Sequence, residues 1–345
     1  MRIGNNPAKS GLPAYKAKEL GIALLTYVPS LVGYFENALE ILKYQINSIY
    51  TSTSQEFDLL VFDNGSCSEV VSALQRYYQQ KRIQWLVLSQ HNLGKTGAWN
   101  WIFGSIPNDL ICYADSDVLF RSGWLEASLD ILKAFPNAGM VSAQPNFFDV
   151  LDGQGKAHKI LEGDQNFEFG TYRPEKEIID EYCFGLGANK QLSERFHNMP
   201  VPYVINKARE ITAVVGATHM QFLTTREIAR QVVPLPVSKG LFRGETTALD
   251  RKIDALGYLH LSTQENLVFH MGNTITERLL SEVSKDMESQ IETREAPERI
   301  VKKKSLPNRL ASRLAKNSSI NRFMLRVYNF LFRVLYTETS EGNRT

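Results

Sequence analysis

The chain has 345 residues, of which 43% are hydrophobic and 22% are charged. This composition can supply the core of one large domain with appendages, and it excludes a wholly disordered chain. The three cysteines, Cys67, Cys112 and Cys183, show no CxxC or Cys/His spacing. They therefore suggest neither a disulfide framework nor a structural zinc site, and they favour a reducing, cytoplasmic setting.

The first twenty residues contain basic and polar groups but no apolar run, so we expect no cleaved signal peptide. Because about 18 uninterrupted apolar residues are needed to cross a bilayer, and the sequence has no such run, we also expect no membrane-spanning helix. The net charge of +2 is unevenly distributed, since residues 301–345 hold ten Lys/Arg and two Asp/Glu. That segment carries +8, and the first 300 residues therefore carry −6.

Short apolar runs alternate with stretches of helical periodicity from residue 21 onward. The predicted strands span residues 21–28, 57–62, 83–88, 109–114 and 138–143. The predicted helices between them span residues 35–49, 67–80, 96–106 and 122–134. This alternation, with continuous apolar strands, predicts an α/β fold with a mostly parallel sheet and helices on both faces.

The pattern becomes irregular between residues 147 and 209, where Gly, Pro, charged and aromatic residues are mixed. We interpret this stretch as an insertion of short mixed elements. Regular pattern returns with a strand at 211–215, helices at 225–232 and 246–256, and a strand at 267–270.

Polar residues lie at the ends of four of the predicted strands. In chain order they are Thr26 and Tyr27, Asp63 and Asn64, His91 and Asn92, and Asp115 to Asp117. In parallel α/β sheets, ligands bind at the carboxyl ends of the strands. We therefore expect these side chains to converge on one binding site.

The sharpest single motif is Asp115-Ser116-Asp117, which follows the apolar strand 109–114. Two carboxylates at one strand end repel each other, and a divalent cation removes that cost. Oxygen ligands suit Mg²⁺ or Mn²⁺, and a diphosphate supplies further oxygens. An isolated DxD is usually a solvated acidic loop, but its position at a strand end favours a metal site here.

Four motifs in this order resemble the glycosyltransferases of the GT-A fold, in particular the large inverting family 2. The resemblance covers about residues 21–272. The motifs are Thr26-Tyr27, Asp63-Asn64-Gly65-Ser66, the NxGxxxAxN segment from Asn92 to Asn100, and Asp115-Ser116-Asp117. The resemblance implies a Rossmann-like GT-A domain that transfers a sugar from a nucleotide-diphosphate sugar to an acceptor hydroxyl with inversion.

The resemblance also implies which residues bind the donor. The implied nucleotide-sugar-binding residues are Thr26, Tyr27, Asp63, Asn92, Gly94, Lys95, Asn100 and Asp115. Asp63 would accept a hydrogen bond from an N–H group of uracil or a similar base, and the glycines of the third motif permit close backbone approach.

The implied metal ligands are Asp115, Asp117 and His270, which would hold Mn²⁺ or Mg²⁺ on the diphosphate. His270 ends the predicted strand 267–270, where enzymes of this fold often place a histidine on the metal. A neutral imidazole is a suitable ligand beside carboxylates.

An acceptor hydroxyl is a poor nucleophile near pH 7 and gains from a positioned carboxylate. The family commonly carries an EDxxLxxRLxxxGY segment, which aligns without a gap with residues 245–258. Thr246 replaces the Asp that is the usual base, and Lys252 replaces the Arg. We therefore predict Glu245 as the catalytic base, with Asp250 as the alternative. Five helical positions apart, they diverge by about 140° and cannot both face one site equally.

The resemblance divides the chain into four parts. They are an N-terminal extension (1–20), a nucleotide-sugar-binding half (21–146), an acceptor-binding and catalytic half (147–275), and a basic helical tail (276–345). His219 lies where the family's acceptor-side segment runs, and it either contacts the acceptor or packs in the core.

The tail has the pattern of a basic amphipathic helix. Apolar residues recur at helical spacing between Ile320 and Leu335, with Arg322, Arg326 and Arg333 on another stripe. Such a helix either lies in the headgroup region of an anionic membrane or packs on the catalytic domain or a dimer partner. We expect residues 305–336 to contact the cytoplasmic face of a membrane, which would suit a lipid-linked acceptor.

Other functions fit less well. A P-loop is excluded at Gly94-Lys95-Thr96, because Ser89 stands where the motif needs a glycine. A nucleotidyltransferase usually carries a Gly-rich basic loop after the first strand, and residues 27–31 are neither. A nucleic-acid binder is disfavoured because the body is acidic and has no recognition module. An inactive glycosyltransferase-like scaffold stays open, since Thr246 replaces the usual base.

The sequence thus predicts a metal-dependent inverting glycosyltransferase that uses Mn²⁺ or Mg²⁺. The expected donor is linked to UDP, GDP or dTDP, and the expected acceptor is a glycan, a polysaccharide or a lipid-linked saccharide. We expect a cytoplasmic protein at the membrane periphery, with no nucleic-acid partner; an oligomer is compatible with the sequence.

Overall fold

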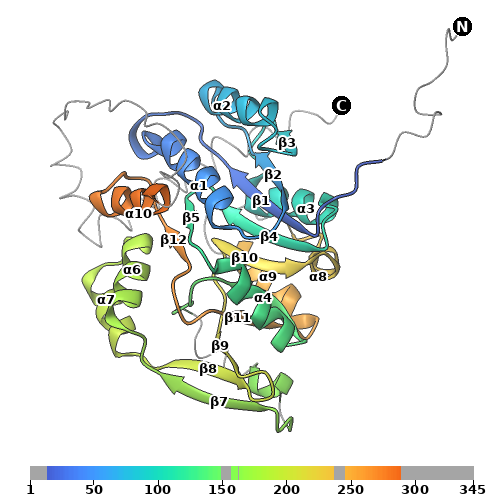
Figure 1. Cartoon of the computed structure of the whole chain (residues 1–345), viewed down its shortest axis with the longest axis vertical. Helices are drawn as coiled ribbons and strands as arrows, with labels where there is room; N and C mark the ends of the chain where they lie inside the picture. The colour runs from blue at the N-terminus through green and yellow to red at the C-terminus, as the bar shows by residue number, and fades with distance from the viewer. Residues whose placement is uncertain (1–13, 149–156, 162, 237–244, 289–345) are drawn as a thin grey trace, which may run out of the picture. The chain divides into compact units, whose positions relative to one another are not determined.

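The computed structural model describes residues 14–148, 157–161, 163–236 and 245–288, with side chains for all of them except 245, 246 and 285–288. These residues belong to one compact unit. Most of its strands and flanking helices are labelled in Figure 1.

A ten-stranded sheet runs through the described residues in the order β3-β2-β1-β4-β10-β6-β11-β9-β8-β7. Its strands are β1 (Leu20–Thr26), β2 (Phe57–Asp63), β3 (Trp85–Leu88), β4 (Leu110–Asp115), β6 (Ala138–Ser142), β7 (Phe167–Tyr172), β8 (Val201–Asn206), β9 (Ile211–Val215), β10 (Gln221–Thr225) and β11 (Leu259–Ser262).

Two kinds of strand pairing divide this sheet. β3, β2, β1 and β4 pair in parallel, and β6 pairs in parallel with β11. β10 runs antiparallel between β4 and β6. At the far end, β9, β8 and β7 form an antiparallel meander. The predicted α/β fold with a largely parallel sheet is confirmed, and the meander is an addition that the sequence did not reveal.

Helices connect and cover the strands. They are α1 (Ala38–Ser52), α2 (Ser68–Gln79), α3 (Gly94–Ser105), α4 (Trp124–Ala134), α6 (Lys176–Leu186), α7 (Lys190–Asn198), α8 (Arg226–Val232), α9 (Glu245–Ala255) and α10 (Glu277–Glu288).

The residues of β1 show how the helices are distributed over the sheet. Successive side chains of a strand point to opposite faces. Ile22 and Leu24 pack in the cluster that contains residues of α1, α2 and α4, whereas Ala23 and Leu25 pack with residues of α3, α8 and α9. Helices therefore cover both faces of the sheet, as the sequence alternation predicted.

The irregular stretch 147–209 contains β7, α6, α7 and β8, so the predicted mixture of short elements is confirmed where the structure describes it. The sequence pattern missed β10 and β11. It also missed β5 (Val118–Phe120), which pairs with β12 (Val268–His270) in a separate two-stranded antiparallel sheet.

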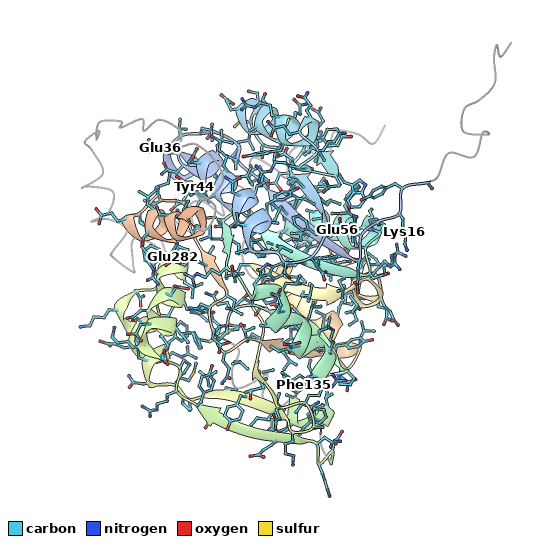
Figure 2. All side chains as sticks on the ribbon, viewed as in Figure 1. Lys16, Glu36, Tyr44, Glu56, Phe135 and Glu282 are labelled. Atoms are coloured by element: carbon cyan, nitrogen blue, oxygen red, sulfur yellow. The ribbon has the colours of Figure 1, made fainter. Side chains whose placement is uncertain are left out.

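A buried ion-pair cluster fastens α10 to the body. Arg121 donates to both oxygens of Glu181 (2.7 and 3.0 Å) and to Glu282, which is labelled in Figure 2 (3.0 Å). Arg278 also donates to Glu181, at 2.7 Å. Because these charges are paired and largely buried, they hold α10 against α6 and the start of β12.

The predicted tail is mostly outside the described residues. The start of the segment 276–345 forms α10, but the amphipathic pattern at 305–336 is not described. Within the described ranges, no helix is both long enough and apolar enough to cross a membrane. The predicted four-part division of the chain stays a prediction.

Candidate active site

The parallel register brings the ends of β1, β2 and β4 to one edge of the sheet. Thr26 pairs with Asp63 on one neighbouring strand, and Leu25 pairs with Asp115 on the other. Three of the residues predicted from the strand ends, Thr26, Asp63 and Asp115, therefore lie side by side. This is the edge at which ligands bind in open α/β sheets, and we refer to it as the donor edge.

Two buried oxygens at the donor edge have no hydrogen-bonding partner in the described part of the chain. They are Thr26 Oγ1 and Asp63 Oδ1, on residues that are 0% and 1% exposed. The other carboxylate oxygen of Asp63, Oδ2, accepts from the backbone N–H groups of Gly65 (3.3 Å) and Ser66 (3.1 Å). Buried polar atoms are normally paired, so these two oxygens are suited to the polar groups of a ligand.

The turn after β2 is tied to the start of α3. Asn64 donates to Asn92 Oδ1 (2.9 Å) and accepts from the backbone N–H of Leu93 (2.8 Å). Asn92 Oδ1 also accepts from the N–H of Gly94 (2.8 Å). Gly94 has a φ of +70°, which favours glycine. These bonds set the loop from 92 to 94 beside Asn64, the residue that follows Asp63.

Both carboxylate oxygens of Asp115 accept a hydrogen bond from within the protein. Its Oδ2 accepts from Lys95 Nζ (2.7 Å), and its Oδ1 accepts from the Tyr113 hydroxyl (2.5 Å). Burial and then the charge of Asp115 raise the pKa of Tyr113 well above its ordinary value, so the hydroxyl remains a donor. The ammonium of Lys95 also lies 5.1 Å from the centre of the Trp99 ring. Lys95 therefore sits at the centre of this network.

Asp117 pairs with His270 across the two-stranded sheet. His270 stands opposite Val118 in the register of β12 and β5. Its Nε2 lies 3.1 Å from Asp117 Oδ2. Burial lowers the pKa of His270, but the charges of Asp117 and then Asp115 outweigh burial and raise this pKa above its ordinary value.

The fit of these residues to a divalent metal is partial. Among the described residues, no group of three or more His, Cys, Asp or Glu side chains is arranged as a metal site. Asp117 and His270 are adjacent and offer one carboxylate and one imidazole, and a ligand's diphosphate would have to supply the remaining oxygens. Asp115, the third predicted ligand, is instead hydrogen-bonded to Lys95 and Tyr113.

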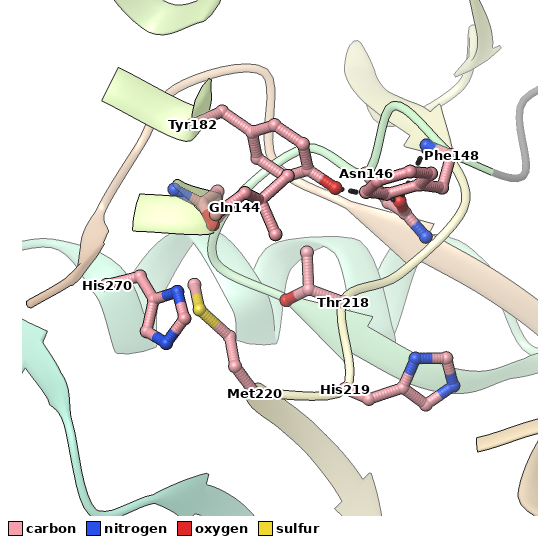
Figure 3. Close-up of a pocket in the computed structure, with 9 residues that line it drawn as sticks. Gln144, Asn146, Phe148, Tyr182, Thr218, His219, Met220 and His270 are labelled. Carbon is pink, nitrogen blue, oxygen red and sulfur yellow. Dashed lines mark hydrogen bonds between the residues drawn. The ribbon is translucent and has the colours of Figure 1, made fainter. Parts of the chain in front are cut away.

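A cavity of about 280 Å³ borders the donor edge. His270 lines the cavity, and so does Met220, whose carbonyl accepts from the N–H of Asp115 (2.8 Å). The full lining is Gln144, Asn146, Phe148, Tyr182, Leu186, Thr218, His219, Met220 and His270, most of which are labelled in Figure 3. These residues come from the segment after β6, from α6, from the β9–β10 loop and from β12.

Polar contacts shape the upper wall of this cavity. The Tyr182 hydroxyl donates to Asn146 Oδ1 (3.2 Å), which also accepts from the N–H of Phe148 (3.0 Å), as the dashed lines in Figure 3 show. Asn146 Nδ2 donates to the carbonyl of Ala217 (2.8 Å). The Phe148 side chain is 46% exposed. The wall thus combines polar groups with an accessible aromatic ring, which is typical of small-molecule sites.

Of the two predicted base residues, Asp250 lies beside the cavity, next to His219. Glu245 begins α9, but its side chain is outside the described set. Asp250, somewhat over one turn further along α9, has its Oδ1 at 2.7 Å from His219 Nε2. His219, for which the sequence left open acceptor contact or packing, lines the cavity.

Two of the residues predicted to bind the nucleotide sugar, Asn100 and Tyr27, lie in different surroundings. Asn100 donates to the carbonyl of Leu235 (2.9 Å) and accepts from its N–H (2.6 Å), so it fastens the segment after α8 to α3. Tyr27 is 38% exposed, and its ring meets Phe35 edge-on at 6.3 Å between centroids. Tyr27 therefore stands at the rim of the donor edge.

Several lining residues were missed from the sequence. Gln144 and Asn146 directly follow β6, so the strand-end rule applied to the predicted strand 138–143 would have indicated them. His260, which does not line the cavity, was also missed, because it lies on β11, which the sequence pattern did not reveal. No local signal placed it near Asp250.

Comparison with known proteins agrees with these observations. Residues 33–196 match the family model described as Glycosyl transferase family 2. The matched range contains Asp63, the segment from Asn92 to Asn100, and the Asp115–Asp117 motif.

Individual relatives are distant. An uncharacterized glycosyltransferase of Nostoc sp. (strain PCC 7120) is 21% identical over 111 residues, which are 32% of this chain and 33% of that protein. The mannosyltransferase PcManGT from Pyrobaculum calidifontis, in complex with GDP-Man and Mn²⁺, aligns over 82% of this chain and 66% of its own, with 13% identity and a TM-score of 0.43. S. aureus TarS 1–349 in complex with UDP-GlcNAc aligns over 37% of this chain and 35% of its own, with 14% identity and a TM-score of 0.31.

This chain therefore spans a third of the length of the Nostoc relative and 66% or less of these two solved enzymes. The family match covers three of the four motifs that the sequence resemblance had singled out, and Thr26-Tyr27 lies outside it. The parallel sheet aligns Thr26, Asp63 and Asp115 at one edge. Residues 33–196, just under half of this chain, are thus similar to Glycosyl transferase family 2.

Proposed function

We propose that the protein transfers a sugar from a nucleotide-diphosphate sugar to an acceptor hydroxyl, with metal assistance and with inversion at the anomeric carbon. One observation carries this proposal. Thr26, Asp63 and Asp115 lie side by side at the donor edge, and the first two present buried oxygens that lack partners in the described residues. Family 2-like motifs in this arrangement support donor binding there.

The nucleotide is assigned to the loops after β1, β2 and β3. Asp63 Oδ1 is suited to accept a hydrogen bond from a base N–H, and Thr26 Oγ1 can pair with a nearby polar group. The loop at Gly94 permits close approach of a backbone to the nucleotide. Lys95 orients Asp115 and places a positive charge beside the region assigned to the diphosphate.

The metal, Mn²⁺ or Mg²⁺, is assigned to Asp117 and His270. Asp115 accepts a hydrogen bond from Lys95 and is not assigned as a direct ligand. When bound, the cation would neutralise charge on the nucleoside diphosphate leaving group. The pairing of β5 with β12 holds Asp117 and His270 together from positions 153 residues apart in the chain.

The acceptor is assigned to the cavity that His270 shares with Asn146, Phe148 and Tyr182. Exposed aromatic rings such as Phe148 stack on apolar sugar faces, and Asn146 can orient hydroxyl groups. Inversion requires the acceptor oxygen to attack from the face opposite the diphosphate. The cavity borders the donor edge and is suited to this approach.

The first test is a thermal-shift screen of UDP, GDP and dTDP and of their sugars, each with and without MnCl₂. GDP-mannose and UDP-GlcNAc are included because they occur with the two solved enzymes. Ligand at about 100 times its dissociation constant stabilises the folded state by about 2.7 kcal/mol. We expect a metal-dependent rise in melting temperature with the nucleotides of one base. With the matching nucleotide sugar, we then expect turnover, measured as released nucleoside diphosphate. Binding without any turnover would instead support an inactive scaffold.

A further inference from the structure

Four titratable side chains form a row beside the acceptor cavity. His219 Nε2 lies 2.7 Å from Asp250 Oδ1, and the same oxygen lies 3.5 Å from His260 Nδ1. At the far end, His260 Nε2 lies 3.3 Å from Asp254 Oδ1. The row joins the β9–β10 loop, α9 and β11, and its members are only 15% to 25% exposed. The four motifs of the donor edge do not include it.

Only one member of the row, His219, lines the cavity. Figure 3 shows its ring at one side of the cavity, with His270 at the opposite side. His270 is already paired with Asp117, on the donor edge. His219 is therefore the histidine on the acceptor side.

The contact with Asp250 determines which nitrogen of His219 can take a proton. In neutral imidazole one nitrogen is a donor and the other an acceptor. Because a carboxylate only accepts, Nε2 carries the hydrogen and donates it to Asp250 Oδ1. Nδ1 then carries a lone pair, and it has no hydrogen-bonding partner among the described residues.

The usual carboxylate base of the family is replaced by Thr246. Asp250 is held by His219 at 2.7 Å and lies near His260, so its Oδ1 is not directed at an acceptor alone. A nucleophile activated by an imidazole that a carboxylate orients is a general arrangement for proton transfer. The geometry here has both parts of it.

We propose that His219 is the catalytic base for the acceptor and that Asp250 is a positioning residue that acts through it. This inference rests on the proposed function. As the acceptor oxygen forms its bond to the anomeric carbon, its proton moves to Nδ1 of His219. The bond from that carbon to the diphosphate oxygen breaks, and the nucleoside diphosphate leaves with the electron pair. Asp250 stabilises the imidazolium, which later releases the proton to water.

The test uses the full chain, with GDP-mannose and UDP-GlcNAc as donors and water as the smallest acceptor. Donor binding is followed by thermal shift, and turnover is followed as released GDP or UDP. His219→Ala should keep the donor-induced shift and lose about 100-fold or more in turnover, the contribution typical of a general base. Added imidazole should restore part of that turnover, which a purely structural role would not permit.

Two further variants sharpen the assignment. Asp250→Asn should lower turnover less than His219→Ala does. The double variant that carries both substitutions should lose no more turnover than His219→Ala alone, because both residues act through one proton transfer. His197→Ala is the matched control. This substitution removes another His–Asp pair, in which His197 Nε2 lies 2.9 Å from Asp180 Oδ1. His197 does not line the cavity. The substitution should leave turnover unchanged.

The outcomes separate this inference from the proposed function. If no donor shifts the wild-type protein, the proposed function fails, and this inference fails with it. If donors bind and His219→Ala turns over at the wild-type rate while Glu245→Gln does not, only the assignment of His219 is overturned. Independently of turnover, ¹⁵N NMR of the wild-type imidazole should show the proton on Nε2. A proton on Nδ1 in the neutral ring would also overturn the assignment.

Discussion

The donor edge and the acceptor cavity are built in opposite ways. At the donor edge, each parallel strand of β1, β2 and β4 delivers its own short motif, and the register aligns the motifs automatically. The acceptor cavity takes its lining from α6, the β9–β10 loop, β12 and the segment after β6. The donor edge is thus specified locally along the chain, whereas the cavity exists only after distant segments pack together.

The largest expected effect lies where the two regions meet, at Asp117 and His270. Either Asp117→Ala or His270→Ala should lower turnover by roughly 10²- to 10³-fold, which is typical when one electrostatic stabiliser is removed. Isothermal titration with MnCl₂ in the presence of the nucleoside diphosphate should show weaker metal binding in both variants. Unchanged Mn²⁺ affinity in both variants would contradict the assignment of Asp117 and His270 as metal ligands.

The pH dependence of metal binding gives a second readout at this boundary. Because Asp117 and Asp115 raise the pKa of His270, its imidazole stays protonated to a higher pH than usual. A protonated imidazole cannot bind a metal, so Mn²⁺ affinity should fall as the pH falls through that raised pKa. In His270→Ala this part of the pH dependence should disappear. A pH profile identical to that of the wild type would contradict the pairing.

Donor affinity is the next largest effect and concerns the donor edge alone. Asp63→Ala removes the buried oxygen that lacks a partner among the described residues. It should weaken nucleotide binding by about ten- to a hundredfold, as expected for a hydrogen bond to a charged group. Titration of the nucleotide that the screen identifies measures this change. The acceptor dependence of turnover at saturating donor should not change.

Asp58 is the matched control for Asp63, because it lies on the same strand and is equally buried. Its carboxylate is already satisfied by Tyr15, by the N–H of Lys18 and by Asn108. Asp58→Asn should therefore lower the melting temperature and leave nucleotide affinity unchanged. If both variants lose affinity equally, the effect of Asp63 is structural.

A smaller effect is expected in the acceptor cavity. Phe148→Ala removes an exposed ring that lines it, and aromatic contacts contribute about 0.5–1.5 kcal/mol beyond area burial. The KM for a sugar acceptor should rise by about two- to tenfold, while donor affinity stays the same. A change in donor affinity without a change in acceptor KM would show that Phe148 contributes to donor binding and not to acceptor binding.

The smallest effect on catalysis is expected from the tail. Deleting residues 305–345 removes most of the +8 charge of the C-terminal segment and its amphipathic pattern. Sedimentation with vesicles that contain phosphatidylserine should fall, while turnover of a soluble acceptor stays near the wild-type value. Equal sedimentation of the full and shortened chains would exclude the membrane role proposed for the tail.

The sequence by itself determined the strand–helix alternation of β1 to β4 and β6, and the motif residues at the donor edge. Both follow from local rules, because apolar runs form buried strands and parallel strands end at the same edge. For this reason, local pattern was enough to place Thr26, Asp63 and Asp115 together. The pairing of Asp117 with His270, the proposed metal ligands, was indicated only through resemblance, because the two residues are far apart in the chain.

Tertiary structure decided everything that depends on pairing between distant segments. β10 enters the sheet between β4 and β6, and β11 pairs with β6, although neither strand has a distinctive local pattern. These strands set the β9–β10 loop and α9 side by side and bring His219 to Asp250. Periodicity reports which face of an element is buried but not which element covers it. The acceptor side of this protein is therefore defined only in the folded chain.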